Sequence, residues 1–217
     1  RRITDAIHAA GAKASIQIGH CGNMTHRATA GCTPVGACTG FNLYSPTLVR
    51  GLKVHEIEGI ADDFGRAVET ARAAGFDCVE VHAGHGYLLS QFLSPYTNRR
   101  HDEFGGSLEN RLRFTRLAME RVMRFMDMVM DEVMKAAGSD MAVLVKMNMD
   151  DGFRSGMHEE ECLEVARALV GMGAHALVLS GGFVSKAPMY VMRGEMPIHS
   201  MTHYMRQAWL KYSVRLF

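Results

Sequence analysis

Residues 79–113 read VEVHAGHGYLLSQFLSPYTNRRHDEFGGSLENRLR, and this stretch decides the fold class. It begins inside an apolar run, FDCVEV at 76–81, of the kind that forms a buried strand. The run ends at His82, and His85 and Tyr87 follow within the next five residues. Two imidazoles and a phenol are therefore expected at the carboxyl end of a strand. In α/β proteins that is where binding and catalytic groups gather.

Apolar periodicity alternates between helix and strand along the rest of the chain. The predicted helices cover 2–10, 57–74, a long segment that starts at the N-cap Ser107 and ends at Gly138, and 158–172, with a further helix at 200–213. The predicted strands are 14–18, 76–81, 141–147 and 176–179, and the third is apolar enough for burial on both faces. This alternation predicts an α/β fold with a parallel sheet, either doubly wound or part of a (β/α)8 barrel.

Two segments lack sustained periodicity. Residues 19 to about 55 contain several glycines and prolines, and residues 82–106 are also irregular. A loop of the first length in a compact domain usually has a function, so we expect it to act as a lid or a substrate wall.

Composition restricts the class of protein. The chain has 217 residues, 47% hydrophobic and 22% charged, which suits one soluble domain with a real core. A net charge of +1 gives no electrostatic reason to expect a nucleic acid or a membrane surface as partner. We find no apolar run of bilayer-spanning length and no signal peptide. The five scattered cysteines favour a reducing compartment, so we expect a cytoplasmic protein without disulfides.

The loop at 19–55 holds the residue types of a metal site without the usual spacing. Its candidates are His20, Cys21, His26, Cys32 and Cys38. They lack the close cysteine pairs of a zinc site, so ordinary loop residues are favoured and no metal is expected.

Polar side chains recur at the ends of the predicted strands. Counting with period 2 places Gln17 opposite its apolar neighbours, Glu80 on the same face as His82, and Lys146 near the end of the third strand, while Ser180 ends the fourth. In a barrel these residues would converge on one floor. Solvation at a strand end is the alternative for the glutamine and the lysine.

Glu80 has a second interpretation. A carboxylate inside VEV is expected to be buried, and a buried carboxylate needs a cation. We favour a structural role for Glu80, tied to an arginine such as Arg111.

The stretch at 79–113 resembles the signature of the Old Yellow Enzyme family of NADH:flavin oxidoreductases and FMN-dependent ene reductases. The resemblance extends to SIQIGH at 15–20, VLVKMNMDDGF at 143–153 and ALVLSGG at 176–182. It implies a (β/α)8 TIM barrel that is incomplete here, with roughly strands three to six present. The expected organisation is a single FMN-binding barrel domain over 1–217, truncated at both ends.

The resemblance also implies residue roles. Gln17 would hydrogen-bond the flavin ring, and Lys146 would be the cation beside flavin N1 and O2. His82 and His85 would grip the substrate carbonyl oxygen, and Tyr87 would be the general acid. The loop residues Asn98, Arg99, Asp102, Gly105, Gly106 and Arg111 would be architectural.

The implied activity is hydride transfer from NAD(P)H through FMN to an activated alkene, an enone or a dienoyl-type molecule. The partner would be a small molecule, and a homo-oligomer is compatible with this picture. Lys146 and Asn23 stand where many members have arginine. An iron–sulfur cluster would belong only to a C-terminal region absent from this sequence. The alternative is a non-catalytic truncated paralogue, or a fragment that no longer binds FMN.

Overall fold

The computed structural model describes residues 1–42, 46–127 and 141–186, and the structural statements that follow concern those residues. A parallel sheet has the order β1-β5-β6-β7, with β1 at Ser15–Ile18, β5 at Cys78–Ala83, β6 at Ala142–Asn148 and β7 at Ala176–Ser180. The helices around it are α1 (Arg2–Ala9), α3 (Val54–Ala73), α5 (Leu108–Asp127) and α6 (Glu159–Gly171). The predicted alternation and the parallel sheet are confirmed.

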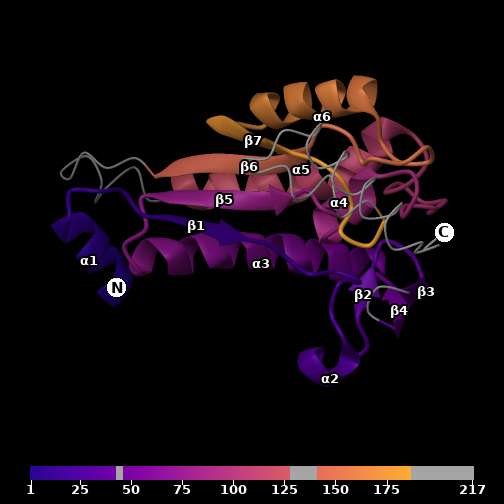
Figure 1. Ribbon diagram of the computed structural model, residues 1–217, viewed down its shortest axis with the longest axis horizontal. Coiled ribbons are helices and arrows are strands. Elements are labelled where there is room, and N and C mark those ends of the chain that lie inside the picture. The colour runs from indigo at the N-terminus through magenta and orange to yellow at the C-terminus, as the bar shows by residue number, and fades with distance from the viewer. Residues whose placement is uncertain (43–45, 128–140, 187–217) are drawn as a thin grey trace, which may run out of the picture.

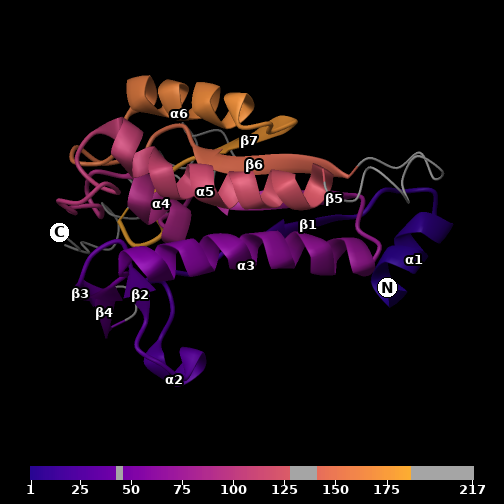
Figure 2. The same cartoon turned by 180° about the vertical axis from the view of Figure 1, so that it is seen from behind.

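The helices cover one face of this sheet. Figure 2 shows α3 and α5 in front of the strands and α6 along the edge of the sheet beside β7, whereas Figure 1, seen from the other side, shows the strands in front of α5. Val79, Val81, Val143 and Val145 are fully buried and belong to the main apolar core, which includes residues of all three helices. Burial of such side chains contributes roughly 1.5–3 kcal/mol each, so this face carries much of the stability.

The opposite face of the sheet is less covered. Along β6, Ala142, Leu144 and Lys146 are half-buried and alternate with buried neighbours. The prediction that this strand is buried on both faces is therefore wrong for the described structure. The open face is the one that presents the polar strand-end residues.

The segment between β1 and α3 contains short regular elements that the sequence did not predict. These are the helix α2 (Arg27–Ala30) and a small sheet of order β2-β4-β3, from Val35–Gly36, Thr47–Gly51 and Gly40–Asn42. Figure 1 places it beyond the carboxyl ends of the main strands. Arg100 fastens it to the body by donating to the Ala37 oxygen at 2.9 Å and the Leu52 oxygen at 2.7 Å.

A second unpredicted element, α4 at Leu88–Leu93, directly follows Tyr87 and is buried throughout. The predicted N-cap of α5 is confirmed, because Ser107 Oγ accepts the Asn110 N–H at 3.3 Å. The expected continuation of that helix to Gly138 and the helix at 200–213 lie outside the described residues.

The contact between α3 and α5 generates a stability prediction. A Cβ on Gly65 would come within 2.5 Å of the Phe125 ring. We expect Gly65→Ala to lower the free energy of unfolding by about 1–3 kcal/mol, because the ring would have to move within a packed interface. Urea unfolding of the purified chain measures this change.

Gly59 on the same helix is the matched control. No heavy atom lies within 4 Å of a Cβ added there. Gly59→Ala should therefore raise the free energy of unfolding by about 0.5–1 kcal/mol through helix propensity. If both variants are stabilised alike, the close approach of Phe125 to α3 is wrong.

Candidate functional site

Strand register brings the predicted strand-end residues to one face. Gln17 pairs with Glu80 across β1 and β5, and His82 pairs with Lys146 across β5 and β6. Paired residues in a parallel sheet point to the same side, as do residues two apart in one strand. All four side chains therefore project from the open face, and the period-2 assignment made from the sequence is confirmed.

Glu80 ties two of these residues together. Its Oε1 lies 2.9 Å from Lys146 Nζ and also accepts a hydrogen bond from Gln17 Nε2. Burial by itself raises the pKa of Glu80, but the hydrogen bonds from Lys146 and Gln17 outweigh it, so the net pKa is lowered. Glu80 is thus a carboxylate at neutral pH that orients one amide and one ammonium.

The expected partnership of Glu80 with Arg111 is wrong. Arg111 lies on α5, on the helix side of the sheet, where it donates to the Leu93 carbonyl and pairs with Glu161 at 2.5 Å. Lys146 lies on the neighbouring strand β6 and is closer to Glu80 than any arginine of a covering helix is. Arg111 remains architectural, as predicted.

His82 is a neutral hydrogen-bond donor. Its Nδ1 accepts the Gly84 N–H at 3.2 Å, which assigns the proton of the neutral ring to Nε2. Burial, and then the positive charges of His85 and Lys146, lower the pKa of His82 to about 4. At neutral pH the ring therefore offers an uncharged N–H.

His85 is held in an unusual backbone conformation. Its φ of 62° is the one positive value at a non-glycine residue in the described part of the chain. Such strain collects at functional sites. Its N–H donates to Asn148 Oδ1 at 2.9 Å, and its Nε2 lies 2.6 Å from Ser180 Oγ. Burial, followed by the charge of Lys146, lowers the pKa of His85.

Tyr87 completes a cluster of three rings. The Tyr87 and His82 rings lie 4.8 Å apart at 72°, and the His82 and His85 rings lie 4.9 Å apart at 83°. The half-buried tyrosine hydroxyl has no hydrogen-bond partner among the described residues. The structure thus brings together the three residues that the sequence predicted, with a phenol O–H available to a ligand.

Asn148 and Asp151 support the cluster, and the sequence prediction missed both. Asn148 is 1% exposed, and its Nδ2 donates to Asp151 Oδ1 at 2.9 Å while its Oδ1 holds His85. Asp151 also accepts from Ser94 Oγ at 2.6 Å, and burial raises its pKa. The polar residues at and just after the end of β6, Asn148, Asp150 and Asp151, were the available signal.

Loop residues assigned to architecture have that role. Asn98 donates to the carbonyls of Phe92 and Phe104, each at 2.7 Å. Arg100 pairs with Asp102 at 2.5 Å. The guanidinium of Arg99 differs, because it is exposed and lies over the Tyr96 ring.

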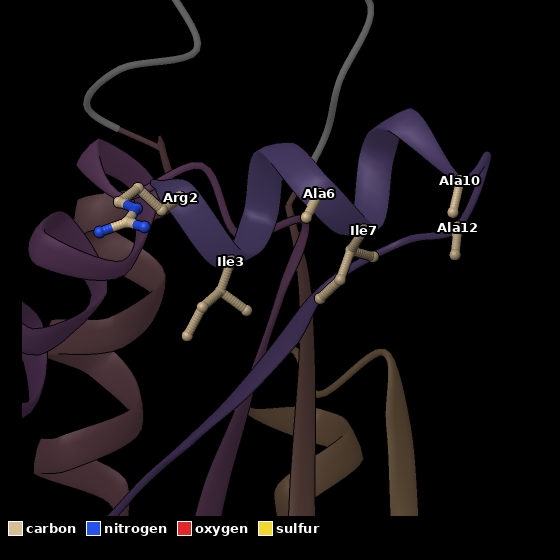
Figure 3. Close-up of a pocket in the computed structure, with 6 residues that line it drawn as sticks. All are labelled: Arg2, Ile3, Ala6, Ile7, Ala10 and Ala12. Carbon is tan, nitrogen blue, oxygen red and sulfur yellow. The ribbon is translucent and has the colours of Figure 1, made fainter.

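Apart from this cluster, the described residues form no metal site and no membrane-spanning helix. Among the described residues, no group of three or more His, Cys, Asp or Glu is arranged to hold a metal ion. Within the same ranges, no helix has the length and apolar character needed to cross a membrane. An open depression lined by Arg2, Ile3, Ala6, Ile7, Ala10 and Ala12 lies along α1, at the end of the molecule away from the rings (Figures 1 and 3).

Comparisons with known proteins agree with this arrangement. A family model described as NADH:flavin oxidoreductase / NADH oxidase matches residues 1–181. A 4,4'-dithiodibutanoate disulfide reductase from Rhodococcus erythropolis is 39% identical over 199 residues, covering 91% of this chain and 47% of that enzyme. The chain therefore spans about half the length of this curated relative.

Two solved structures share the fold. An Old Yellow Enzyme homologue from Zymomonas mobilis matches with a TM-score of 0.70 at 25% identity, over 95% of this chain and 63% of that one. Morphinone reductase in complex with tetrahydroNAD matches with a TM-score of 0.68 at 28% identity, over 82% of this chain and 51% of that one. The four-stranded sheet is thus similar to part of a TIM barrel.

The environment of His82 predicts how it titrates. Its pKa near 4 lies below the ordinary histidine value of 6.5, so the unfolded chain binds more protons at His82 between those values. The stabilising contribution of neutral His82 should be complete above pH 6.5 and should be lost as the pH falls toward 4. NMR titration of the imidazole measures the pKa of His82 directly.

His158 supplies an internal control. A hydrogen bond to the Arg154 carbonyl, and then one to Asp150, raise its pKa above 6.5. The two histidines should therefore titrate on opposite sides of that value. A His82 that titrates with His158 would contradict its assignment as a buried neutral donor.

Proposed function

This chain belongs to the NADH:flavin oxidoreductase / Old Yellow Enzyme family, and on that premise we propose that it is the substrate-binding half of an FMN-dependent ene reductase. The observation that carries the proposal is the cluster of His82, His85 and Tyr87 beside Lys146 and Gln17. Two neutral imidazoles, a phenol and a cation on one open face are a donor set for reducing an activated carbonyl compound.

The residues present fit the ring of FMN. Gln17 offers an amide, which can both donate to and accept from the edge of a flavin. Lys146 offers a cation, which favours a ring that gains negative charge when reduced. Both lie on the face of the sheet that the helices leave open. The chemistry that bound FMN supplies is hydride transfer from NAD(P)H to an activated alkene.

His82 and His85 would bind the substrate. Donation from the Nε2–H of His82 to a carbonyl oxygen polarises the conjugated alkene and stabilises the enolate that develops. Neutral imidazoles suit this role because they bind the oxygen without giving up a full proton. The Asn148 bond to the His85 backbone fixes the second ring in place.

Tyr87 would supply the proton. A phenol is protonated at neutral pH, so it can donate to the α-carbon while the β-carbon accepts hydride. The C=C bond is thereby reduced by one hydride and one proton, and solvent returns a proton to the phenolate. The ring contact with His82 holds the hydroxyl near a carbonyl bound at that imidazole.

The relatives support the reductant but not a particular substrate. The solved morphinone reductase holds tetrahydroNAD, which supports a nicotinamide nucleotide as the hydride source for this chain too. Since the chain covers 47% of its reductase relative from Rhodococcus erythropolis, the activity of the whole protein belongs to the proposal. The competing proposal is a chain that no longer binds FMN.

Flavin retention separates the two proposals. The purified chain is mixed with FMN and desalted, and its visible spectrum is recorded beside that of Lys146→Met. We expect a retained flavin band in the parent and a weaker one in the variant, because the cation at the ring edge is lost. A folded parent that retains no flavin would support the non-binding alternative.

Replacement of Tyr87 tests the proton donor. Tyr87→Phe should slow alkene reduction by about 10²-fold, the usual contribution of a general acid, because the proton source is removed while the ring stays. Reduction of the flavin by NAD(P)H should keep its rate, since that half-reaction needs no phenol. Stopped-flow absorbance resolves the two steps, and equal loss of both would exclude Tyr87 as the acid.

A further inference from the structure

Glu80 carries the one negative charge of the main sheet, and the proposed chemistry gives it no part. Among the residues of β1, β5, β6 and β7, Glu80 is the one carboxylate and Lys146 is the one lysine or arginine. The register places them on neighbouring strands, because Glu80 pairs with Leu144 and His82 pairs with Lys146. A single pair of opposite charges therefore lies on the face that the helices leave open.

The pair is close and only partly exposed to solvent. Glu80 Oε1 lies 2.9 Å from Lys146 Nζ, and the two side chains are 15% and 24% exposed. Water and salt therefore screen this pair less than they screen an ion pair on the surface. The Lys146 ammonium has no other ion pair among residues 1–42, 46–127 and 141–186. Glu80 is thus the residue that determines where this ammonium lies.

Glu80 also determines the orientation of the Gln17 amide. An ionised carboxylate can only accept hydrogen bonds, so it selects the Nε2 end of the amide, which donates to Glu80 Oε1. Gln17 Oε1 has no hydrogen-bond partner in the part of the chain that the structure describes. One carboxylate oxygen therefore positions both groups that the proposed function assigns to the flavin, the amide and the ammonium.

The neighbouring histidines respond to both charges. Burial is the largest cause that lowers the pKa of His85; the charge of Lys146 lowers this pKa further, and the charge of Glu80 raises it. The same two charges act in the same directions on the pKa of His82, after burial and the charge of His85. Glu80 therefore offsets part of the field of Lys146 at both rings. The imidazoles can serve as probes of that offset without any cofactor.

We propose that Glu80 is a positioning residue of the reaction, which holds Lys146 at the flavin edge and offsets part of its charge. Reduction gives the flavin a negative charge, and an uncompensated ammonium at its edge would stabilise reduced FMN strongly. A reduced cofactor that is stabilised too well is a weaker hydride donor. The offset by Glu80 leaves reduced FMN less stabilised, and therefore more reactive toward an alkene. This consequence for FMN rests on the proposed function, whereas the offset of charge is a property of the chain alone.

NMR titration of His85 in the full chain without flavin tests the offset. Glu80→Gln keeps an acceptor for Lys146 but removes the charge, so the pKa of His85 should fall. Lys146→Met should raise this pKa, because the positive charge is lost. In the double variant, Glu80→Gln with Lys146→Met, the pKa should lie between those of the two single variants.

Glu69→Gln is the matched control for the loss of charge. It removes the same charge from the exposed surface of α3, on the helix side of the sheet. The pKa of His85 should not change in this variant. A pKa of His85 that stays the same or rises in Glu80→Gln would overturn the proposal.

Flavin-loaded protein tests the consequence for the cofactor. Glu80→Gln should raise the reduction potential of bound FMN by about 30 mV or more, which corresponds to a tenfold gain in affinity for reduced over oxidised FMN. Potentiometry with redox dyes measures this shift, again beside Glu69→Gln. A potential that is unchanged or lower in Glu80→Gln would overturn the role assigned to Glu80. A parent chain that retains no FMN would count against the proposed function, and the titration of His85 would still decide whether Glu80 offsets Lys146.

Discussion

The register of β5 between β1 and β6 is the constraint on which the site depends. It pairs Gln17 with Glu80 and His82 with Lys146, so four polar side chains leave the sheet on one face. A slip of one residue would turn Val79 and Val81 to that face and drive the polar side chains among the helices. The apolar contacts with α3 and α5 therefore determine indirectly where the polar side chains lie, because these contacts are compatible with one register of β5.

The electrostatic neutrality of the open face follows from that register. Glu80 and Lys146 compensate each other, and the lowered pKa values of His82 and His85 keep both imidazoles uncharged at neutral pH. The face therefore offers N–H and O–H donors rather than net charge. Such donors suit a ligand oxygen that becomes negative only during reaction, because they stabilise that state without first having to lose a bound counter-ion.

The sequence predicted the strands of the main sheet and the helices that cover it, but it missed the short elements of the irregular segments. Helical spacing over 57–74 and alternation around 76–81 persist through enough residues to reveal α3 and β5. The strands of the small sheet and α4 have two to six residues each and lie in the stretches without sustained periodicity, and tertiary contacts such as those of Arg100 hold the sheet in place. The ring cluster was predictable because its members adjoin in sequence. The partner of Glu80 was not, because it depends on strand order.

The pairing of Lys146 with Glu80 also determines over what distance each part of this surface attracts a ligand. An ammonium has three donors and the carboxylate oxygen uses one, so Lys146 can hold a ligand without releasing Glu80. The pair has no net charge, so its electrostatic attraction for a ligand decays within a few ångströms. Arg99 and Lys186 form no ion pair with a carboxylate in the described ranges, so their attraction for an anion extends over about a Debye length, ~8 Å at physiological ionic strength. Added salt should thus weaken the attraction of Arg99 and Lys186 for an anion and leave the contact of a ligand with Lys146 almost unaltered.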